Sequence, residues 1–329
     1  MLRNGVAINE SLKVLASNAS SGRVKRLATE LRKSVEGGRS FSACLAEHPQ
    51  VFDQTYIGVA QAGEGSATLG ESMNYMADWL EHRHDLRSNI QRALLYPSII
   101  LGAVGMLLIL IITFLLPRII PIFASFKTEL PLPTKMLVAL AGFMSEHGLI
   151  VALCVVAVCI LVILVRRIQV VRRMLDHTLL HIPIIGALNH EYQLAVYCKS
   201  FGMLYEKGVR VNEASLTAAK TITNSYMRSV AMRVASQTEH GKDLASLLGE
   251  YPTVFPAHMR AITGVSERSG SLARSLNEIA DHYAKRVSYK SERLPTLLEP
   301  LLLTAIGILI GFIAISIILP IYQLSSSLQ

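Results

Sequence analysis

Two stretches of the chain repeat the same order of polar and apolar positions. Each begins with charged, helix-forming sequence, reaches a proline, continues as an uncharged apolar run and ends at a second proline. Pro97 and Pro117 flank residues 98–116 in the first stretch, and Pro300 and Pro320 recur 203 residues later. The pattern indicates a polar helical segment that leads into an apolar helix, and it occurs twice.

Three uncharged runs have the length of membrane helices, namely residues 98–116, 149–165 and 301–319. At 1.5 Å per residue the outer two reach about 28 Å, close to the thickness of a bilayer core. The middle run is at the short end of this range. Buried core helices are the alternative. With 51% hydrophobic and 17% charged residues, the composition favours three transmembrane helices.

The polar segments show helical periodicity and no sustained strand-like alternation. Over residues 24–35 the apolar positions Val24, Leu27, Leu31 and Val35 are spaced for one helix face while charged residues face away. Ser40 is a plausible N-cap for the short helix that follows. The sequence predicts an all-α protein whose first helices cover residues 11–19, 24–35, 40–47 and 53–61 and a long segment from 68 onward.

The two stretches align without a gap at an offset of 203 residues. We call residues 5–117 the first copy and residues 208–320 the second copy. Matched positions gather at turns, caps and core positions, which indicates an internal duplication. They include Asn9 and Asn212, Gly38 and Gly241, Pro49 and Pro252, Phe52 and Phe255, Glu64 and Glu267, Asp78 and Asp281, and Arg83 and Arg286.

The copies differ at their beginnings. A predicted helix over residues 191–205 precedes the second copy, with Leu194, Tyr197, Phe201 and Leu204 spaced for one face. At the same offset, its counterpart would come before residue 1. We therefore expect that the first copy lacks its opening helix, through a shortened chain or a late start codon.

The distribution of Lys and Arg predicts the orientation of the chain in the membrane. Residues 1–97 hold eleven and residues 166–293 hold eighteen, whereas residues 118–148 hold three and the tail after residue 319 holds none. Because basic loops stay on the cytoplasmic side, the predicted domains follow in order. They are a cytoplasmic helical domain at 1–97, a span at 98–116, a periplasmic loop at 117–148, a span at 149–165, a second cytoplasmic helical domain at 166–297, a span at 301–319 and a periplasmic tail at 320–329.

The net charge of +8 fits the same orientation. Basic residues beside a span attract anionic lipid headgroups. No cluster of base-stacking aromatic residues accompanies them, so membrane lipid is the expected partner and nucleic acid is not.

Signals for catalysis, cofactors and metals are missing from the sequence. There is no phosphate-binding Gly-x-x-x-x-Gly-Lys-Ser/Thr loop and no Gly-x-Ser-x-Gly turn. The apolar runs carry no ionisable Asp, Glu, Lys, Arg or His, which would mark an ion path or a membrane-embedded enzyme. His177 and His181 have helical metal-ligand spacing but no evident third ligand. We expect no enzymatic activity, no cofactor and no metal.

Several ordered motifs carry a resemblance to a known family. They are residues 5–12, 38–45 and 49–52, Ala-Gly-Glu-Gly-Ser-Ala-Thr-Leu at 62–69, Ala-Leu-Leu-Tyr-Pro at 93–97 and Leu-Pro-Leu-Pro-Thr at 130–134. Together they resemble the type II secretion F family, the inner-membrane platform proteins of type II secretion systems and type IV pili. The turn motif departs from the family pattern at Ala67 and Ser266, which stand where that pattern has glycine.

The resemblance implies a non-enzymatic platform in the bacterial inner membrane. Such a protein would couple a cytoplasmic assembly ATPase to insertion of pilin or pseudopilin subunits into a fibre, among other inner-membrane assembly proteins and as a homo-oligomer. A membrane transporter or membrane-embedded enzyme of unknown substrate is the alternative function. A lipid-surface scaffold without an ATPase partner is another.

The turn motif supplies candidate site residues in both copies. One interpretation is structural: the acid offsets the dipole of the following long helix and the serine caps it. The other is a contact with a partner or a metal on the cytoplasmic surface. The residues concerned are Glu64, Ser66 and Leu69, then Glu267, Ser269 and Gly270.

Two further sets of residues concern the membrane. The proposed membrane junctions are Tyr96, Pro97, Pro117, Pro300 and Pro320. Gly307 and Gly311 form a Gly-x-x-x-Gly pattern that permits close helix packing, within the chain or between copies, although ordinary membrane glycines are an alternative.

Overall fold

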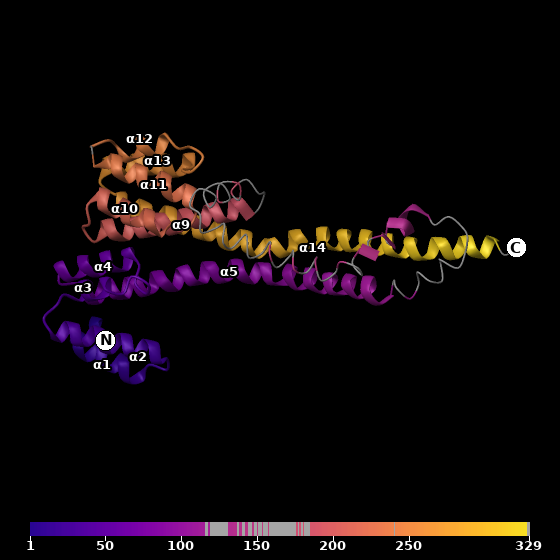
Figure 1. Ribbon diagram of the computed structural model, residues 1–329. Coiled ribbons are helices and arrows are strands. Elements are labelled where there is room, and N and C mark those ends of the chain that lie inside the picture. Colours follow the sequence, from indigo (N-terminus) through magenta and orange to yellow (C-terminus); the bar gives the residue numbers. More distant parts are fainter. Residues whose placement is uncertain are drawn as a thin grey trace. The chain divides into compact units, whose positions relative to one another are not determined.

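The computed structural model describes residues 1–115, 185–239 and 241–327 and scattered positions between 118 and 180 (Figure 1). All regular structure within these residues is helical. The chain forms two compact units. The helical unit combines Met1–Ser88 with Arg173–Tyr289, and the apolar unit combines Asn89–Arg172 with Lys290–Gln329.

The described part of the first half contains one short 3₁₀ helix, five α-helices and a final π-helical turn. They are η1 (Leu2–Asn4), α1 (Ile8–Asn18), α2 (Gly22–Glu36), α3 (Phe41–Ala46), α4 (Gln54–Gly65), α5 (Leu69–Leu110) and η2 (Ile111–Leu115).

The second half repeats this series after one additional helix. Its elements are α9 (Ile185–Glu206), α10 (Val211–Thr221), α11 (Ser225–Thr238), α12 (Leu244–Gly249), α13 (Ala257–Ser269) and α14 (Leu272–Ser327).

Helix positions in the two copies agree with the predicted offset of 203 residues. Helices α1 and α10 match at both ends, α3 and α12 also match at both ends, and the two long helices start at Leu69 and Leu272. The turns match too, because Gly5 and Gly208 have φ of 80° and 83°. Each glycine adopts the left-handed conformation that is costly for other residues. The duplication read from the sequence is therefore also a duplication of secondary structure.

The two copies bury their cores to different degrees. In the first copy a small cluster is formed by Leu12, Leu31, Phe41, Cys44, Leu45 and Ala60. Phe52 is only partly buried there and Val51 is 55% exposed, whereas their equivalents Phe255 and Val254 are buried.

Helix α9 explains this difference. Its Tyr197 packs against Phe255 with ring centroids 6.1 Å apart, and the ring of His190 bonds the carbonyl of Val254 at 2.9 Å. The predicted helix over residues 191–205 is confirmed and is longer than expected. The expectation of one apolar face was too narrow, because Ala195, Val196 and Met203 are also buried.

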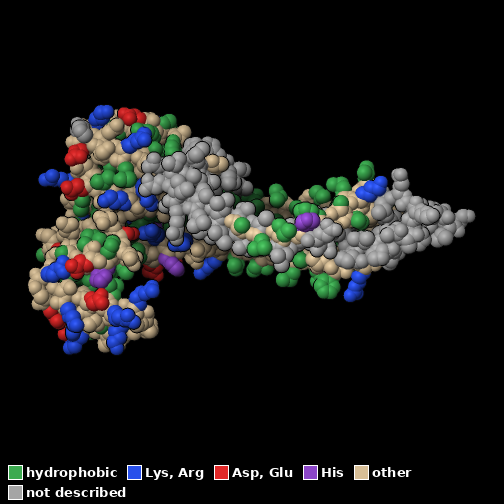
Figure 2. All heavy atoms as spheres, viewed as in Figure 1, with side chains coloured by type: hydrophobic (Ala, Val, Ile, Leu, Met, Phe, Trp, Pro, Cys, Tyr) green, Lys and Arg blue, Asp and Glu red, His purple; other side chains and the backbone are tan. Residues whose placement is uncertain are grey.

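Helices α5 and α14 carry the long apolar segments. Each contains a window that is long and apolar enough to cross a membrane; none of the window in α5 is buried and 17% of that in α14 is. In Figure 2 charged side chains gather on the helical unit, and hydrophobic side chains predominate on the described part of the apolar unit. Unburied apolar helices of this length indicate an all-α membrane protein.

The prolines do not stop these helices. Pro97 lies inside α5, and α14 continues through both Pro300 and Pro320. A proline removes one backbone donor but is tolerated in an apolar helix when other groups satisfy the carbonyl that loses its partner. The π-helical turn η2 ends two residues before Pro117 in the sequence, and Pro117 itself lies outside the described residues.

The two prolines at 131 and 133 favour an extended backbone, and this expectation is wrong from residue 132 onward. Residues 132–136 are helical, and the amide of Lys135 bonds the carbonyl of Pro131 at 2.9 Å. Pro133 is in the first turn, where a missing N–H costs nothing. The predicted span at 149–165 and the pair His177 and His181 lie outside the described residues, apart from single positions in the span.

Candidate functional site: the paired glutamates and the seam between the copies

Glu64 holds the beginning of helix α3. Its Oε1 accepts the amide of Phe41 at 2.5 Å, and its Oε2 accepts the amide of Ser42 at 2.9 Å as well as the hydroxyl of Ser42. Ser40 adds the predicted N-cap, since its Oγ accepts the amide of Ala43 at 3.3 Å. A carboxylate here satisfies free backbone donors and favours the positive end of the helix dipole.

Glu267 makes the equivalent contact in the second copy. Its two oxygens accept the amides of Leu244 and Ala245 at 2.7 and 3.1 Å, at the beginning of α12. Each glutamate lies near the C-terminal end of one helix and binds the N-terminal end of a helix about 22 residues earlier. One interpretation of the sequence was that each glutamate stabilises the start of the long helix that follows it. The structure shows that it stabilises the start of the short helix that precedes it, α3 or α12.

The serines of the motif also act locally. The Ser66 hydroxyl donates to the carbonyl of Ala62 at 2.8 Å, and the Ser269 hydroxyl lies 3.4 Å from the carbonyl of Ser266. Each also lies within 2.8 Å of the hydroxyl two residues later, on Thr68 or Ser271. These bonds cap the C-terminal ends of α4 and α13. They are not the expected N-caps of the long helices that follow.

The two departures from glycine are accommodated differently. Ala67 has φ of 57°, in the left-handed region that its counterpart Gly270 adopts at 71°. Ser266, in contrast, is buried and its hydroxyl donates to the carbonyl of Thr263 at 3.0 Å. At the equivalent Gly63 a Cβ would lie 2.6 Å from the Ser72 hydroxyl oxygen. Ser266 is thus compatible with its site, while Ala67 is strained.

Leu69 and Leu272 begin the two long helices. Leu69 packs on the core of the first copy, and Leu272 is 3% exposed. Leu69 therefore serves the packing of the first copy, and the buried Leu272 begins α14.

A contact surface joins α4 of the first copy to α9 and α10, and we call it the seam. Gly58 lies close to α9, because a Cβ there would lie 3.1 Å from Cδ2 of Leu204. On α5, the hydroxyl of Tyr75 lies 3.4 Å from Oδ1 of Asn277 and 3.5 Å from Oε2 of Glu206. Burial, followed by the charge of Glu206, raises the pKa of Tyr75 to about 12.

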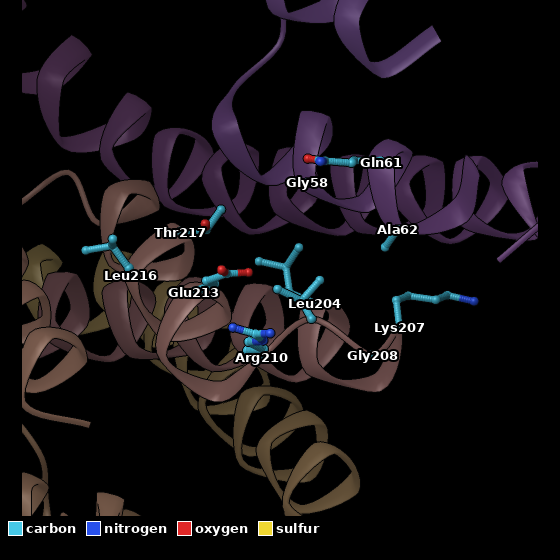
Figure 3. Close-up of a pocket in the computed structure, with 11 residues that line it drawn as sticks. Gly58, Gln61, Ala62, Leu204, Lys207, Gly208, Arg210, Glu213, Leu216 and Thr217 are labelled. Carbon is cyan, nitrogen blue, oxygen red and sulfur yellow. The ribbon is translucent and has the colours of Figure 1, made fainter. Parts of the chain in front are cut away.

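An open cleft of about 480 Å³ lies along the seam. Figure 3 shows Gln61 and Ala62 on the α4 side, with Leu204, Arg210 and Glu213 opposite them. The cleft is also lined by Lys207. At the offset of 203 residues Lys207 and Arg210 align with Asn4 and Ala7, so the first half of the chain has no cation at either position.

The equivalent arginines Arg83 and Arg286 bind different acids. Arg83 pairs with Asp53 at 3.1 Å, while Arg286 pairs with Glu191 of α9 at 2.5 Å. The Glu191 side chain is only 7% exposed. The partners differ because Pro256 stands at the position of Asp53 and offers Arg286 no carboxylate.

The junction prolines also differ between copies. Pro97 is buried, whereas Pro300 is exposed, and Tyr96 is 46% exposed. The side chain of Pro320 lies outside the described residues.

The glycines of the third apolar run have no close packing partner in the described part of the chain. Among the described residues, nothing would come within 4 Å of a Cβ at Gly307 or Gly311. Close helix packing at this pair stays a prediction.

Sequence reasoning missed two polar contacts. Asp176 Oδ2 accepts the amide of Ser225 at 2.8 Å, which supports the start of α11. Thr134 donates to the carbonyl of Ser316 at 2.7 Å. Both contacts join segments that are far apart in the chain, so no local sequence pattern predicts them. Among the described residues no three His, Cys, Asp or Glu side chains are grouped for a metal.

Helices repeated at a constant offset, matched glutamate contacts and two long unburied apolar helices define a membrane protein built by internal duplication. The sequence matches the family described as Type II secretion system (T2SS), protein F, over residues 1–117 and 197–320. The chain belongs to this family, whose members are inner-membrane proteins. The two matched segments contain the two copies.

Curated relatives cover the whole chain. It is 31% identical over 330 residues to a type IV pilus assembly protein PilC of Myxococcus xanthus, with 100% of this chain and 79% of the relative aligned. A PilC of Thermus thermophilus is 28% identical, with 100% and 81% aligned. A type II secretion system protein F of Pseudomonas aeruginosa is 27% identical, with 99% and 80% aligned.

Proposed function

We propose that this chain is the non-enzymatic inner-membrane platform of a type IV pilus or type II secretion machine. The observation that carries the proposal is the alignment of the whole chain with proteins named for both systems. The platform couples a cytoplasmic assembly ATPase to insertion of pilin or pseudopilin subunits into a fibre. The ATPase supplies the energy, and this chain transmits the movement.

The proposed topology has three spans, at residues 98–116, 149–165 and 301–319. The N-terminus and both sets of helices face the cytoplasm, and the loop at 117–148 and the C-terminal tail face the periplasm. The charge distribution supports this orientation. The long apolar helices at Leu69–Leu115 and Leu272–Leu319 support the first and third of these spans.

Co-purification in mild detergent tests the proposed partners. The tagged full chain should retain the assembly ATPase and pilin-like subunits, with other inner-membrane assembly proteins and further copies of itself. Deletion of the gene should stop fibre assembly or secretion, and the intact gene should restore it. Recovery of neither partner from a strain that assembles fibres normally would count against the proposal.

A further inference from the structure

Pro320 removes a hydrogen bond from the apolar helix α14. In an α-helix the N–H of each residue bonds the carbonyl four residues earlier, and proline has no N–H. The carbonyl that loses its donor is that of Ser316. Thr134 supplies a replacement from 182 residues away, because its hydroxyl lies 2.7 Å from this carbonyl.

The contact is buried on both sides. Thr134 is 2% exposed and Ser316 is 1% exposed, and the neighbouring Ile313 is 8% exposed. The Ser316 hydroxyl already donates to the carbonyl of Phe312 at 2.7 Å. Without Thr134, the Ser316 carbonyl would be left in apolar surroundings, where an unsatisfied backbone group is unfavourable.

The segment around Thr134 presents this one hydroxyl inward. It is a helical turn stiffened by Pro131 and Pro133, and its neighbours Leu132 and Met136 are 76% and 65% exposed. Two threonines of the long apolar segments bond one turn back along the chain instead: Thr113 reaches the carbonyl of Ile109 and Thr304 that of Pro300, both at 2.7 Å. The Thr134 bond, in contrast, joins two separate segments.

We propose that Thr134 is a positioning residue that fastens residues 131–136 to α14 at its proline. The hydroxyl replaces the missing N–H of Pro320 and fixes the course of α14 beyond Ser316. The connection between the first two predicted spans is thereby held against the third. This inference stands independently of the function proposed above.

Hydrogen exchange of the purified full chain in detergent tests the bond, with mass spectrometry of peptides that cover residues 131–136 and 317–327. Thr134→Val keeps the shape and removes the donor, and it should speed exchange in both peptides about three- to tenfold, the range of hydrogen bonds within membranes. Thr134→Ser should restore slow exchange. Thr304→Val is the matched control, which should leave residues 131–136 unchanged.

Pro320→Ala makes the test specific. It supplies an N–H of its own for the Ser316 carbonyl, so adding Thr134→Val to Pro320→Ala should cause little further acceleration. Equal acceleration with proline or alanine at position 320, or none with Thr134→Val alone, would overturn the proposal. If Thr134→Val alone fails to accumulate, recovery of the double variant to the level of the intact chain supports the proposal and equal loss refutes it.

Discussion

Ala67 is the only non-glycine residue with positive φ among the described positions. Because Gly270 adopts the equivalent conformation without strain, Ala67→Gly should stabilise the protein by about 0.5–1 kcal/mol. Gly270→Ala should destabilise it by about 1–2 kcal/mol. Fluorescence of Trp79, which is buried in α5 and is the one tryptophan of the chain, can follow thermal unfolding in detergent. A lower melting temperature for Ala67→Gly would contradict the assignment.

His282 makes stability depend on pH. Burial, followed by the nearby His258 and Arg286, lowers its pKa. The folded chain therefore binds fewer protons here than the unfolded chain, so stability is present above pH about 6.5 and falls as the pH drops below it. The melting temperature should decline from pH 7.5 to 5, and His282→Asn should reduce that decline. An equal decline with asparagine at position 282 would contradict this prediction.

The repeat in the sequence showed which side chains matter in both copies, but it did not show which groups those side chains bind. Glu64 and Glu267 were recognised because they recur at one offset, and Ser40 because a serine before a short apolar helix is a common cap. The actual partners of the glutamates could not be predicted. They are backbone amides about 22 residues earlier, and their approach depends on how α4 packs against α3.

At the scale of elements, the glutamates tie pairs of helices together. Glu64→Ala should free the amides at the start of α3 and lower the free energy of unfolding by about 1–3 kcal/mol, since buried donors lose their acceptor. Glu267→Ala should cost a similar amount through α12. Thermal unfolding followed by Trp79 measures both. Glu47→Ala, which removes an exposed ion pair with Arg39, should have a much smaller effect.

The seam depends on the missing side chain at Gly58. Gly58→Leu should push α4 away from Leu204 and destabilise the helical unit by about 1–3 kcal/mol. Ala261→Leu is the matched control, because Ala261 is the equivalent position on α13 and is exposed. The two variants can be compared by melting temperature. An equal fall in melting temperature for both variants would show that the close approach at Gly58 does not determine how α4 packs against α9.

Helix positions were predictable, but the burial of α9 was not. Its spacing of Leu194, Tyr197, Phe201 and Leu204 predicted one apolar face. Its further buried residues follow from a tertiary arrangement in which α9 packs against α10 and also against α4 of the first copy. Apolar periodicity predicts the buried residues of a helix that packs on one face. It predicts them poorly for a helix that packs on several faces.

For the whole molecule, the proposed function places the junction prolines between the cytoplasmic helices and the spans. Replacement of Pro97 or Pro300 by alanine should abolish fibre assembly or secretion, because it alters the helices that transmit movement. Immunoblots of membranes and Trp79 unfolding should first show that each variant is folded. Because Pro300 is exposed and Pro97 is buried, Pro300→Ala is the variant expected to retain more stability. Normal output from a folded variant would contradict the proposed transmission.

The packing of α4 against α9 also has a consequence in time. Helix α4 ends at Gly65 and α9 begins at Ile185, about 120 residues later. At a synthesis rate of about 5–20 residues per second, roughly 6 to 24 seconds separate their emergence from the ribosome. During that interval the newly made α4 cannot pack against α9. The first copy therefore exposes this surface of α4 until α9 has been synthesised.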